Sequence, residues 1–446
     1  MTKKASVKFV CSSCGAAFGS WTGRCNTCGE WNTIQEQIDT TLSLRGHKGS
    51  LDPRPLSQVL VQDTVARIPT AMPDLDTVLG GGLVPGGVVL LAGEPGIGKS
   101  TLLLQVAAAV QKHGKVLYVS GEESAHQVAM RATRLGVVAD HIDIASTAAT
   151  NDIAATIQKG GYQLAIVDSI QTVGVEEISS AVGSVSQITN STQLLSAAAK
   201  ASNTALILVG HVTKEGSIAG PKVLEHTVDA VLQLEGDRYG GFKLLRSIKN
   251  RFGATGETGI FEMTEKGLAS VANPSAALLA ERQIADGSVV HATIEGSRAL
   301  LVEIQALVNP TSYGYPKRAA SGFDSNRLNL LIAMLERRTK LKLGDKDIYI
   351  NVVGGIRLNE PAADLAVVMA IASAAKGMQL KKHAVVFGEL GLSGELRHVP
   401  MTEKRVQEAK KLGFDGAIGP QVSKKITGLV SVKTVREALN TFLEKE

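Results

Sequence analysis

The chain has 446 residues, of which 44% are hydrophobic and 4% aromatic, and its formal net charge is +5. This length suggests two or three domains, and no apolar run is long enough to span a bilayer. The first residues are basic but lack the apolar stretch of a secretory signal, which favours the cytoplasm as the location.

The first predicted domain is a metal-binding module over residues 1–33. All four cysteines of the chain lie here, in two Cys-x-x-Cys pairs separated by ten residues: Cys11, Cys14, Cys25 and Cys28. Four thiolates on two tight turns are typical of a closed structural zinc site. Two disulfides are one alternative, disfavoured in a reducing compartment. A thioredoxin-like redox pair is another, disfavoured because no βαβ pattern surrounds the cysteines.

The module is too small to fold on apolar burial alone, so zinc binding and folding are expected to be one event. Trp21 and Trp31, the two tryptophans of the chain, are expected to cover its small core. Residues 34–62 are polar and have no sustained periodicity, which predicts a linker.

Residues 63–272 are expected to form an α/β domain. Helical stretches such as 188–202 separate short apolar runs that are typical of buried strands. These runs occupy residues 88–92, 116–119, 164–167 and 205–209. The alternation predicts a largely parallel, doubly wound sheet.

A P-loop follows the first of these strands and opens into a predicted helix, which is the context that the motif requires. Its glycines allow backbone N–H groups to surround a polyphosphate, and the helix amino terminus favours negative charge. Lys99 is expected to reach the β- and γ-phosphates of ATP, and the Ser100 hydroxyl to hold Mg²⁺. A chance glycine-rich turn is the alternative. The predicted nucleotide-binding residues are Gly93, Glu94, Pro95, Gly96, Ile97, Gly98, Lys99, Ser100 and Thr101.

Three further side chains are predicted at the ends of neighbouring strands. Asp168 ends an apolar strand, from which its carboxylate can hold Mg²⁺ through water; a helix cap is the alternative. Glu122 or Glu123 can activate the attacking water. We favour Glu122 and expect one of the two to cap the next helix. His211 is a candidate γ-phosphate sensor or a locally satisfied histidine.

Two basic segments follow. Residues 212–222 are polar and glycine-rich, and Lys214 and Lys222 are expected to contact nucleic-acid phosphates, unless this is simply a mobile surface loop. Lys249 and Arg251 lie two residues apart on an extended segment, so they project the same way. Held at a subunit edge, they could reach a neighbour's γ-phosphate, as an arginine finger does. A basic surface turn is the alternative.

At Lys249-Asn-Arg-Phe-Gly253 the chain resembles the bacterial RadA (Sms) family of recombination ATPases. The resemblance covers almost the whole chain and includes the four-cysteine knuckle and residues 79–83, 120–124 and 214–222. It implies a RecA-like ATPase that forms a hexameric ring, binds single-stranded DNA and promotes branch migration of recombination intermediates as a helicase-like motor in DNA repair. The family also connects the pentapeptide with DNA-stimulated activity, so a DNA-facing role for Lys249 and Arg251 stays open. The zinc module is expected to bind a recombinase or replication protein.

Residues 273–446 are expected to form a second α/β domain, which over 348–446 resembles the proteolytic domain of Lon. The segment that carries the nucleophile of Lon corresponds to Glu360-Pro-Ala-Ala363, which places Ala362 at the serine position. Alanine has no nucleophilic atom, and the segment with the activating lysine matches residues 400–405 only loosely. We therefore expect a proteolytically inactive scaffold with basic faces for DNA. An ATP-dependent protease and a nucleotide-switched assembly protein without motor activity are the rival functions.

Overall fold

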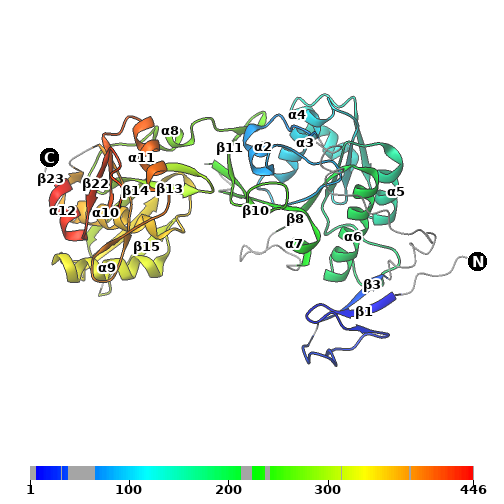
Figure 1. The fold of residues 1–446 in the computed structure, drawn as a ribbon, viewed down its shortest axis with the longest axis horizontal. Coiled ribbons are helices and arrows are strands. Elements are labelled where there is room, and N and C mark those ends of the chain that lie inside the picture. Colours follow the sequence, from blue (N-terminus) through cyan, green and yellow to red (C-terminus); the bar gives the residue numbers. More distant parts are fainter. Residues whose placement is uncertain are drawn as a thin grey trace, which may run out of the picture. The chain divides into compact units, whose positions relative to one another are not determined.

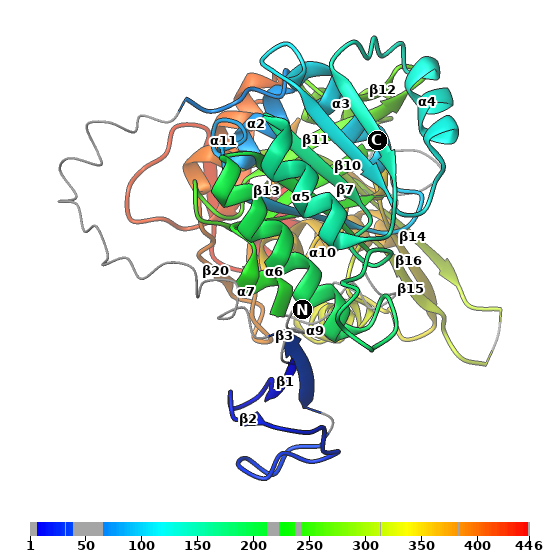
Figure 2. The ribbon, with the colours of Figure 1, turned by 90° about the vertical axis from the view of Figure 1, so that its right-hand side faces the viewer.

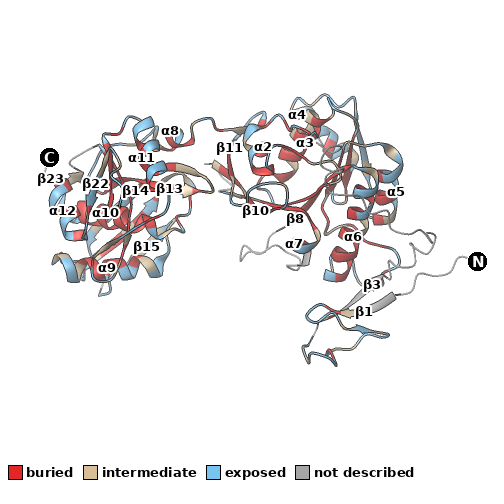
Figure 3. Ribbon diagram, viewed as in Figure 1, coloured by how far each residue is buried: buried red, intermediate tan, exposed pale blue. Residues whose placement is uncertain are grey.

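The chain divides into two compact units, each with its own buried core (Figures 1 and 3). The first consists of Met1–Arg238 with Lys243–Ser270, and the second of Tyr239–Phe242 with Val271–Glu446. Within the part of the chain that is described, no helix is long and apolar enough to cross a membrane. The computed structural model describes residues 7–31, 33–38, 66–211, 223–236, 242–312, 314–380 and 383–444.

The amino-terminal module is a three-stranded antiparallel sheet in the order β2-β1-β3. Its buried cluster consists of Cys11, Cys25 and Ile34. So small a core must be supplemented by a metal or a covalent cross-link. The strands are β1 (Val7–Cys11), β2 (Ala17–Phe18) and β3 (Ile34–Ile38).

Two predictions for this module are wrong. The linker does not begin at residue 34, because Ile34–Ile38 pairs with β1. Trp21 and Trp31 do not cover the core, because they are 60% and 68% exposed. The buried residues of the core are instead Ile34 and two of the cysteines, Cys11 and Cys25. The rest of the predicted linker, 39–62, lies outside the described residues.

The first unit is built on a nine-stranded sheet in the order β12-β11-β10-β9-β4-β8-β7-β5-β6. The six strands from β9 to β6 are parallel, whereas β10 runs antiparallel to β9, and β12 to β11. The strands are β4 (Val88–Gly93), β5 (Val116–Ser120), β6 (Ile142–Ser146), β7 (Leu164–Asp168), β8 (Ala205–His211), β9 (Ala230–Gly236), β10 (Phe242–Asn250), β11 (Thr258–Thr264) and β12 (Gly267–Ser270).

Helices cover both faces of this sheet (Figure 2). Successive residues of a strand point to opposite faces. Val89 and Leu91 of β4 therefore pack in one apolar cluster with α3, and Val88 and Leu90 in a second cluster with α5 and α6. This is the predicted doubly wound arrangement. The helices are α2 (Pro73–Leu79), α3 (Lys99–Val110), α4 (Ala125–Arg134), α5 (Thr150–Gly160), α6 (Val185–Ser202) and α7 (Val223–Thr227).

The second unit has a seven-stranded mixed sheet in the order β15-β16-β14-β13-β18-β21-β22. Helices α9, α10 and α12 pack in one apolar cluster, and α11 contributes Val406 and Ala409 to another. Its strands are β13 (Ser288–Glu295), β14 (Arg298–Pro310), β15 (Arg318–Ser321), β16 (Lys346–Val352), β18 (Ala384–Val386), β21 (Gly416–Pro420) and β22 (Leu429–Val432). Two short antiparallel pairs join β17 (Gln379–Leu380) to β23 (Leu443–Glu444), and β19 (Glu389–Leu390) to β20 (Leu396–Arg397). The helices are α8 (Pro274–Leu279), α9 (Ser325–Thr339), α10 (Asp364–Lys376), α11 (Thr402–Lys411) and α12 (Val435–Phe442).

Candidate functional site

The P-loop joins the carboxyl end of β4 to the amino end of α3. Gly96 and Gly98 have φ angles of 78° and 118°, in the left-handed region that favours glycine. At Gly93, an added Cβ would lie 2.8 Å from the carbonyl oxygen of Leu234. The glycines are therefore required by backbone shape and close packing. The turn brings the first N–H groups of α3 to the sheet edge, where the helix end favours phosphate.

The Lys99 ammonium lies against the loop itself. Its Nζ donates to the carbonyl oxygens of Gly93 at 2.8 Å and Glu94 at 3.0 Å. Burial lowers the pKa of Lys99, while the carboxylates of Asp168, Glu122 and Glu94 act in the opposite direction. A long flexible stem allows this ammonium to exchange carbonyl partners for phosphate oxygens.

Asp168 is the last residue of β7, and one of its oxygens is already held. The hydroxyl of buried Tyr118 donates to Oδ2 at 2.9 Å. Burial and the charge of Asp168 raise the pKa of Tyr118 well above its usual value, so Tyr118 remains a donor. The other carboxylate oxygen and the Ser100 hydroxyl, in the first turn of α3, are hard oxygen ligands of the kind Mg²⁺ prefers.

The two glutamates that follow β5 have different partners. Glu123 forms a two-pronged ion pair with Arg131 of α4, at 2.6 and 2.7 Å. Glu122 accepts a hydrogen bond of 2.7 Å from Ser169 Oγ, beside Asp168 in sequence. The expectation that one glutamate caps the next helix is wrong, because Ser124 caps α4. Glu122 is thus the glutamate directed toward the P-loop side chains.

His211 ends β8 and lies between Lys99 and Glu122. Its Nδ1 is 3.4 Å from Lys99 Nζ, and its Nε2 is 3.3 Å from Glu122 Oε1. Burial acts to raise the pKa of Glu122, but hydrogen bonds from Ser169 and His211 and the nearby positive charges outweigh it, so the pKa is lowered. A glutamate that stays ionised can orient or deprotonate water. Lys99, Glu122 and His211 form one connected cluster at the carboxyl edge of the sheet, and Asp168 lies close enough to act on the charge of Lys99.

Arg251 lies at the opposite edge of this sheet. It forms an ion pair of 3.1 Å with Asp229, and the Asp229 carboxylate also accepts the N–H of Val88, the first residue of β4. The P-loop begins at the other end of β4, about 16 Å away at a rise of about 3.3 Å per residue. Arg251 therefore does not line the P-loop of its own subunit.

Lys249 shares this location. Its Nζ donates to the carbonyl oxygens of Val228, at 2.8 Å, and of Glu225. Burial and the charge of Arg251 lower its pKa. Lys249 and Arg251 thus both reach the segment before β9, as their spacing predicts. The side chain of Arg251 is 54% exposed.

Two predicted DNA-binding residues, Lys214 and Lys222, fall in segment 212–222, which lies outside the described residues. That segment begins at the residue after His211. Lys249 and Arg251 are the predicted DNA-binding residues that the structure describes.

The four cysteines form one cluster, with all sulfur atoms within 4.8 Å of one another. Cys11 and Cys28, like Cys14 and Cys25, have their sulfurs 3.6 Å apart. A disulfide bond is about 2.05 Å long, so the two-disulfide alternative does not fit. Four metal–sulfur bonds of about 2.3 Å in a tetrahedron separate the sulfurs by about 3.8 Å. The observed spacing therefore fits one four-coordinate metal ion.

The predicted nucleophile position holds Ala362, a buried methyl group with no nucleophilic atom. Nearby, Arg405 donates to both carboxylate oxygens of Glu360, at 2.8 and 2.5 Å. Burial acts to raise the pKa of Glu360, but the hydrogen bonds from Arg405 hold it well below its usual range. An arginine does not deprotonate in proteins. In the segment expected to supply the lysine of Lon, Arg405 is thus held in this ion pair, and Lys404 donates to the carbonyl oxygen of Ser297 at 2.9 Å.

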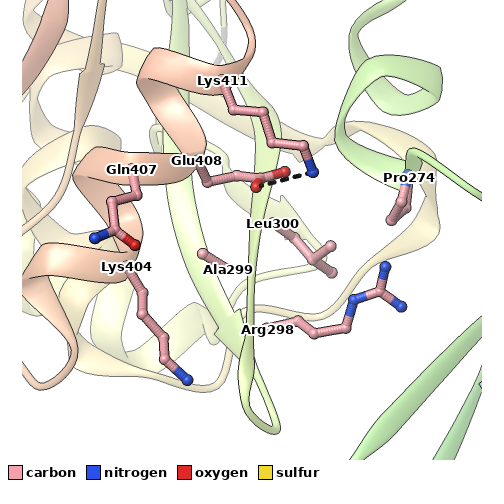
Figure 4. Close-up of a pocket in the computed structure, with 8 residues that line it drawn as sticks. All are labelled: Pro274, Arg298, Ala299, Leu300, Lys404, Gln407, Glu408 and Lys411. Carbon is pink, nitrogen blue, oxygen red and sulfur yellow. Dashed lines mark ion pairs between the residues drawn. The ribbon is translucent and has the colours of Figure 1, made fainter. Parts of the chain in front are cut away.

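A basic pocket of about 320 Å³ lies in the same unit (Figure 4). Lys404 and Lys411 project from α11, and Arg298 lies on the facing strand β14. Lys411 forms an ion pair of 3.7 Å with Glu408, which also accepts a hydrogen bond from Ser275. The lining therefore carries an excess of positive charge and is suited to an anionic ligand.

Three residues that position the carboxylates were not predicted from the sequence: Tyr118, Ser169 and Arg131. Tyr118 is concealed in an apolar run, and the partner role of Arg131 depends on the packing of α4. Ser169 could have been predicted, because it directly follows Asp168 at the end of a predicted strand.

The chain is 45% identical to the DNA repair protein RadA of Bacillus subtilis, over 99% of each chain. It is 46% identical to that of Listeria monocytogenes and 43% identical to that of Escherichia coli, again over 99% of each chain. This chain belongs to the RadA family. A crystal structure of the RadB recombinase matches at 23% identity over 46% of this chain and 99% of its own, with a TM-score of 0.38, too low to support an argument.

Domain families match in the predicted order. Residues 9–36 match a rubredoxin metal binding domain, 53–217 an AAA domain, and 324–423 the subunit ChlI of Mg-chelatase. The predicted fold class is therefore confirmed: a metal ribbon, a RecA-like P-loop core and a Lon-like α/β domain.

Proposed function

We propose that this chain is a DNA-dependent ATPase that forms a ring, binds single-stranded DNA and drives branch migration of recombination intermediates. Relatives that are similar over their whole length are DNA repair proteins. The observation that supports the proposal is that the charged residues lie at two opposite edges of the sheet. Lys99, Glu122 and His211 cluster at one edge of the sheet, whereas Arg251 lies at the other. Arg251 can reach a P-loop only if that P-loop belongs to another subunit.

ATP and Mg²⁺ are the proposed cofactors. The backbone N–H groups between Gly93 and Thr101, except at Pro95, which has none, and the Lys99 ammonium would hold the phosphates, and Ser100 and Asp168 would hold the metal. A Mg²⁺ ion held by Ser100 and Asp168 would supply positive charge beside the phosphate oxygens. Tyr118 keeps the Asp168 carboxylate in a fixed orientation.

Hydrolysis of ATP requires a water molecule in line with the γ-phosphate. In our proposal the ionised Glu122 orients that water or takes its proton, and Ser169 and His211 fix the carboxylate. Lys249 and Arg251 of a neighbouring subunit stabilise the transition-state charge, which completes the site only in an assembled homohexamer.

DNA contact is assigned to Lys214 and Lys222, in the segment that follows His211, with Lys249 and Arg251 as further candidates. Arg298, Lys404 and Lys411 form a basic surface on the Lon-like domain that suits the same polyanion. Peptidase activity is not part of the proposal, because Ala362 supplies no nucleophile.

The four cysteines are proposed to bind zinc, in a module that extends to Ile38. The proposed ATPase domain is 63–272 and the inactive Lon-like domain 273–446. The cytoplasm is the proposed location, and a recombinase or replication protein is the proposed partner of the zinc module.

The proposal is tested by titrating ATPase activity with single-stranded DNA while measuring mass with and without nucleotide. We expect turnover to rise, the mass to reach that of a ring, and affinity to fall as salt rises. Unchanged turnover and mass at saturating DNA would contradict the motor. Stimulated ATPase without movement of a branched substrate would instead favour a nucleotide-switched assembly protein.

A further inference from the structure

The metal ribbon carries the two tryptophans of the chain on its surface. Trp21 is 60% and Trp31 68% exposed. Both rings lie beside Gly23: a Cβ added there would be 3.8 Å from Cη2 of Trp21 and 3.9 Å from Cζ3 of Trp31. Two exposed indoles therefore flank a position that has no side chain.

Arg24 is held beside them. Its Nε donates to the carbonyl oxygen of Gly29 at 2.7 Å, and its guanidinium carbon lies 5.7 Å from the centre of the Trp31 ring. A backbone bridge joins Arg24 to Trp31. Because Gly29 follows the second cysteine pair, a metal bound by these cysteines would fix this turn and Arg24 with it.

The residues on this surface indicate which class of ligand it can bind. Within residues 9–31 of the described chain, the exposed large apolar side chains are Trp21 and Trp31, and the charged residues are Arg24 and Glu30. A stable protein interface buries about 800 Å² on each partner, which favours a broader apolar surface than two rings. Aromatic and guanidinium planes on a surface with a single cationic side chain are suited to stacking on bases.

We propose that Trp21, Arg24 and Trp31 form a base-stacking site for single-stranded nucleic acid. The site depends on the proposed function only for the choice of single-stranded DNA as its ligand. It differs from the contacts assigned to the ATPase domain because it binds base faces rather than phosphates. Duplex DNA, whose base faces are covered, is a poor ligand for it.

The tryptophan fluorescence of the full-length protein reports on this site directly, because both tryptophans belong to it. We expect oligothymidylate to quench the emission. An abasic oligonucleotide of equal length and charge should leave the emission unchanged, since it has phosphates but no bases. The quenching should persist at salt concentrations that weaken phosphate contacts.

Binding of labelled oligothymidylate to variants supplies the second measurement. Stacking contributes enough that Trp31→Ala should weaken binding roughly 5-fold to 150-fold for each base released. Trp31→Phe should retain most of the affinity, because a phenyl ring still stacks. Tyr315→Ala is the matched control, because Tyr315 is an aromatic residue that is 89% exposed in the other unit. Bound zinc is measured for each variant to show that the ribbon is intact.

Equal quenching by the abasic strand, or equal affinities for the wild type and Trp31→Ala, would overturn the inference. Affinity for a recombinase lost in Trp31→Ala while oligothymidylate binding is unchanged would assign the surface to a protein instead. If only the stacking site is wrong, DNA still stimulates the ATPase activity but base-dependent quenching is absent. If only the proposed function is wrong, quenching is observed but DNA does not stimulate the ATPase activity.

Discussion

Arg251 gives the sharpest test of a catalytic site shared between subunits. Arg251→Ala should lower ATP turnover by about 10³-fold to 10⁵-fold, the range for the loss of an arginine finger. Asp229 is buried, but without Arg251 it keeps the hydrogen bond from the N–H of Val88 and the ion pair with Lys200 at 3.9 Å, so the variant is expected to fold. Misfolding therefore does not explain the expected loss.

Mixing two inactive variants separates a shared site from a local one. Lys99→Ala keeps an intact Arg251 but has a defective P-loop, whereas Arg251→Ala has the opposite defect. In head-to-tail rings assembled from equal amounts, about one quarter of the interfaces pair a normal P-loop with a normal arginine. The mixture should thus recover up to about one quarter of wild-type turnover, measured as phosphate release after joint assembly.

A local role predicts no recovery, because neither variant has a complete site of its own. Continued inactivity in mixed rings, with mixed assembly shown by mass, would refute the reasoning. Arg246→Ala is the matched control. Arg246 lies on β10, the strand that Arg251 directly follows, and is paired with Glu235 at 3.2 Å, so its removal should leave turnover near that of the wild type.

Three further changes test other parts of the structure. Ser169→Ala removes a hydrogen bond that lowers the pKa of Glu122, so the acidic limb of the ATPase pH profile should move to higher pH; an unmoved limb would remove Glu122 from the reaction. Cys28→Ala should release the zinc and unfold the ribbon with the P-loop domain still folded, and stoichiometric zinc retained in a metal assay would contradict this. Arg405→Leu leaves the Glu360 carboxylate without its buried partner and should destabilise the second unit by about 3–5 kcal/mol. Urea unfolding measures that loss, and an unchanged midpoint would show that the ion pair contributes little.

The sequence predicted the parallel strands well because strands covered on both faces are continuous apolar runs. Val88–Gly93 and Leu164–Asp168 are such runs. Residues that directly follow such runs lie at the carboxyl edge of the sheet, which is why Glu122, Asp168 and His211 could be predicted as neighbours of the P-loop.

Partners that are distant in sequence could not be predicted in this way. Ser169 and Glu122 are 47 positions apart. Glu122 and Glu123 have different roles because Arg131, on α4, lies close to Glu123. The prediction that the tryptophans cover the core was wrong for another reason. In a ribbon organised by a metal, the sulfur cluster decides which side chains are buried, so hydrophobicity alone misplaced Trp21 and Trp31.

The contacts of His211 suggest how phosphate and DNA are coupled in the proposed motor. Lys99, as an ammonium, can only donate, so Nδ1 of a neutral His211 must accept and Nε2 must carry the hydrogen directed at Glu122. A change in the partners of Lys99 therefore changes the hydrogen bond that orients Glu122. Segment 212–222, to which the proposed DNA contacts are assigned, begins at the next residue of the chain. One side chain can thus link the phosphate, the catalytic carboxylate and the proposed contact with DNA.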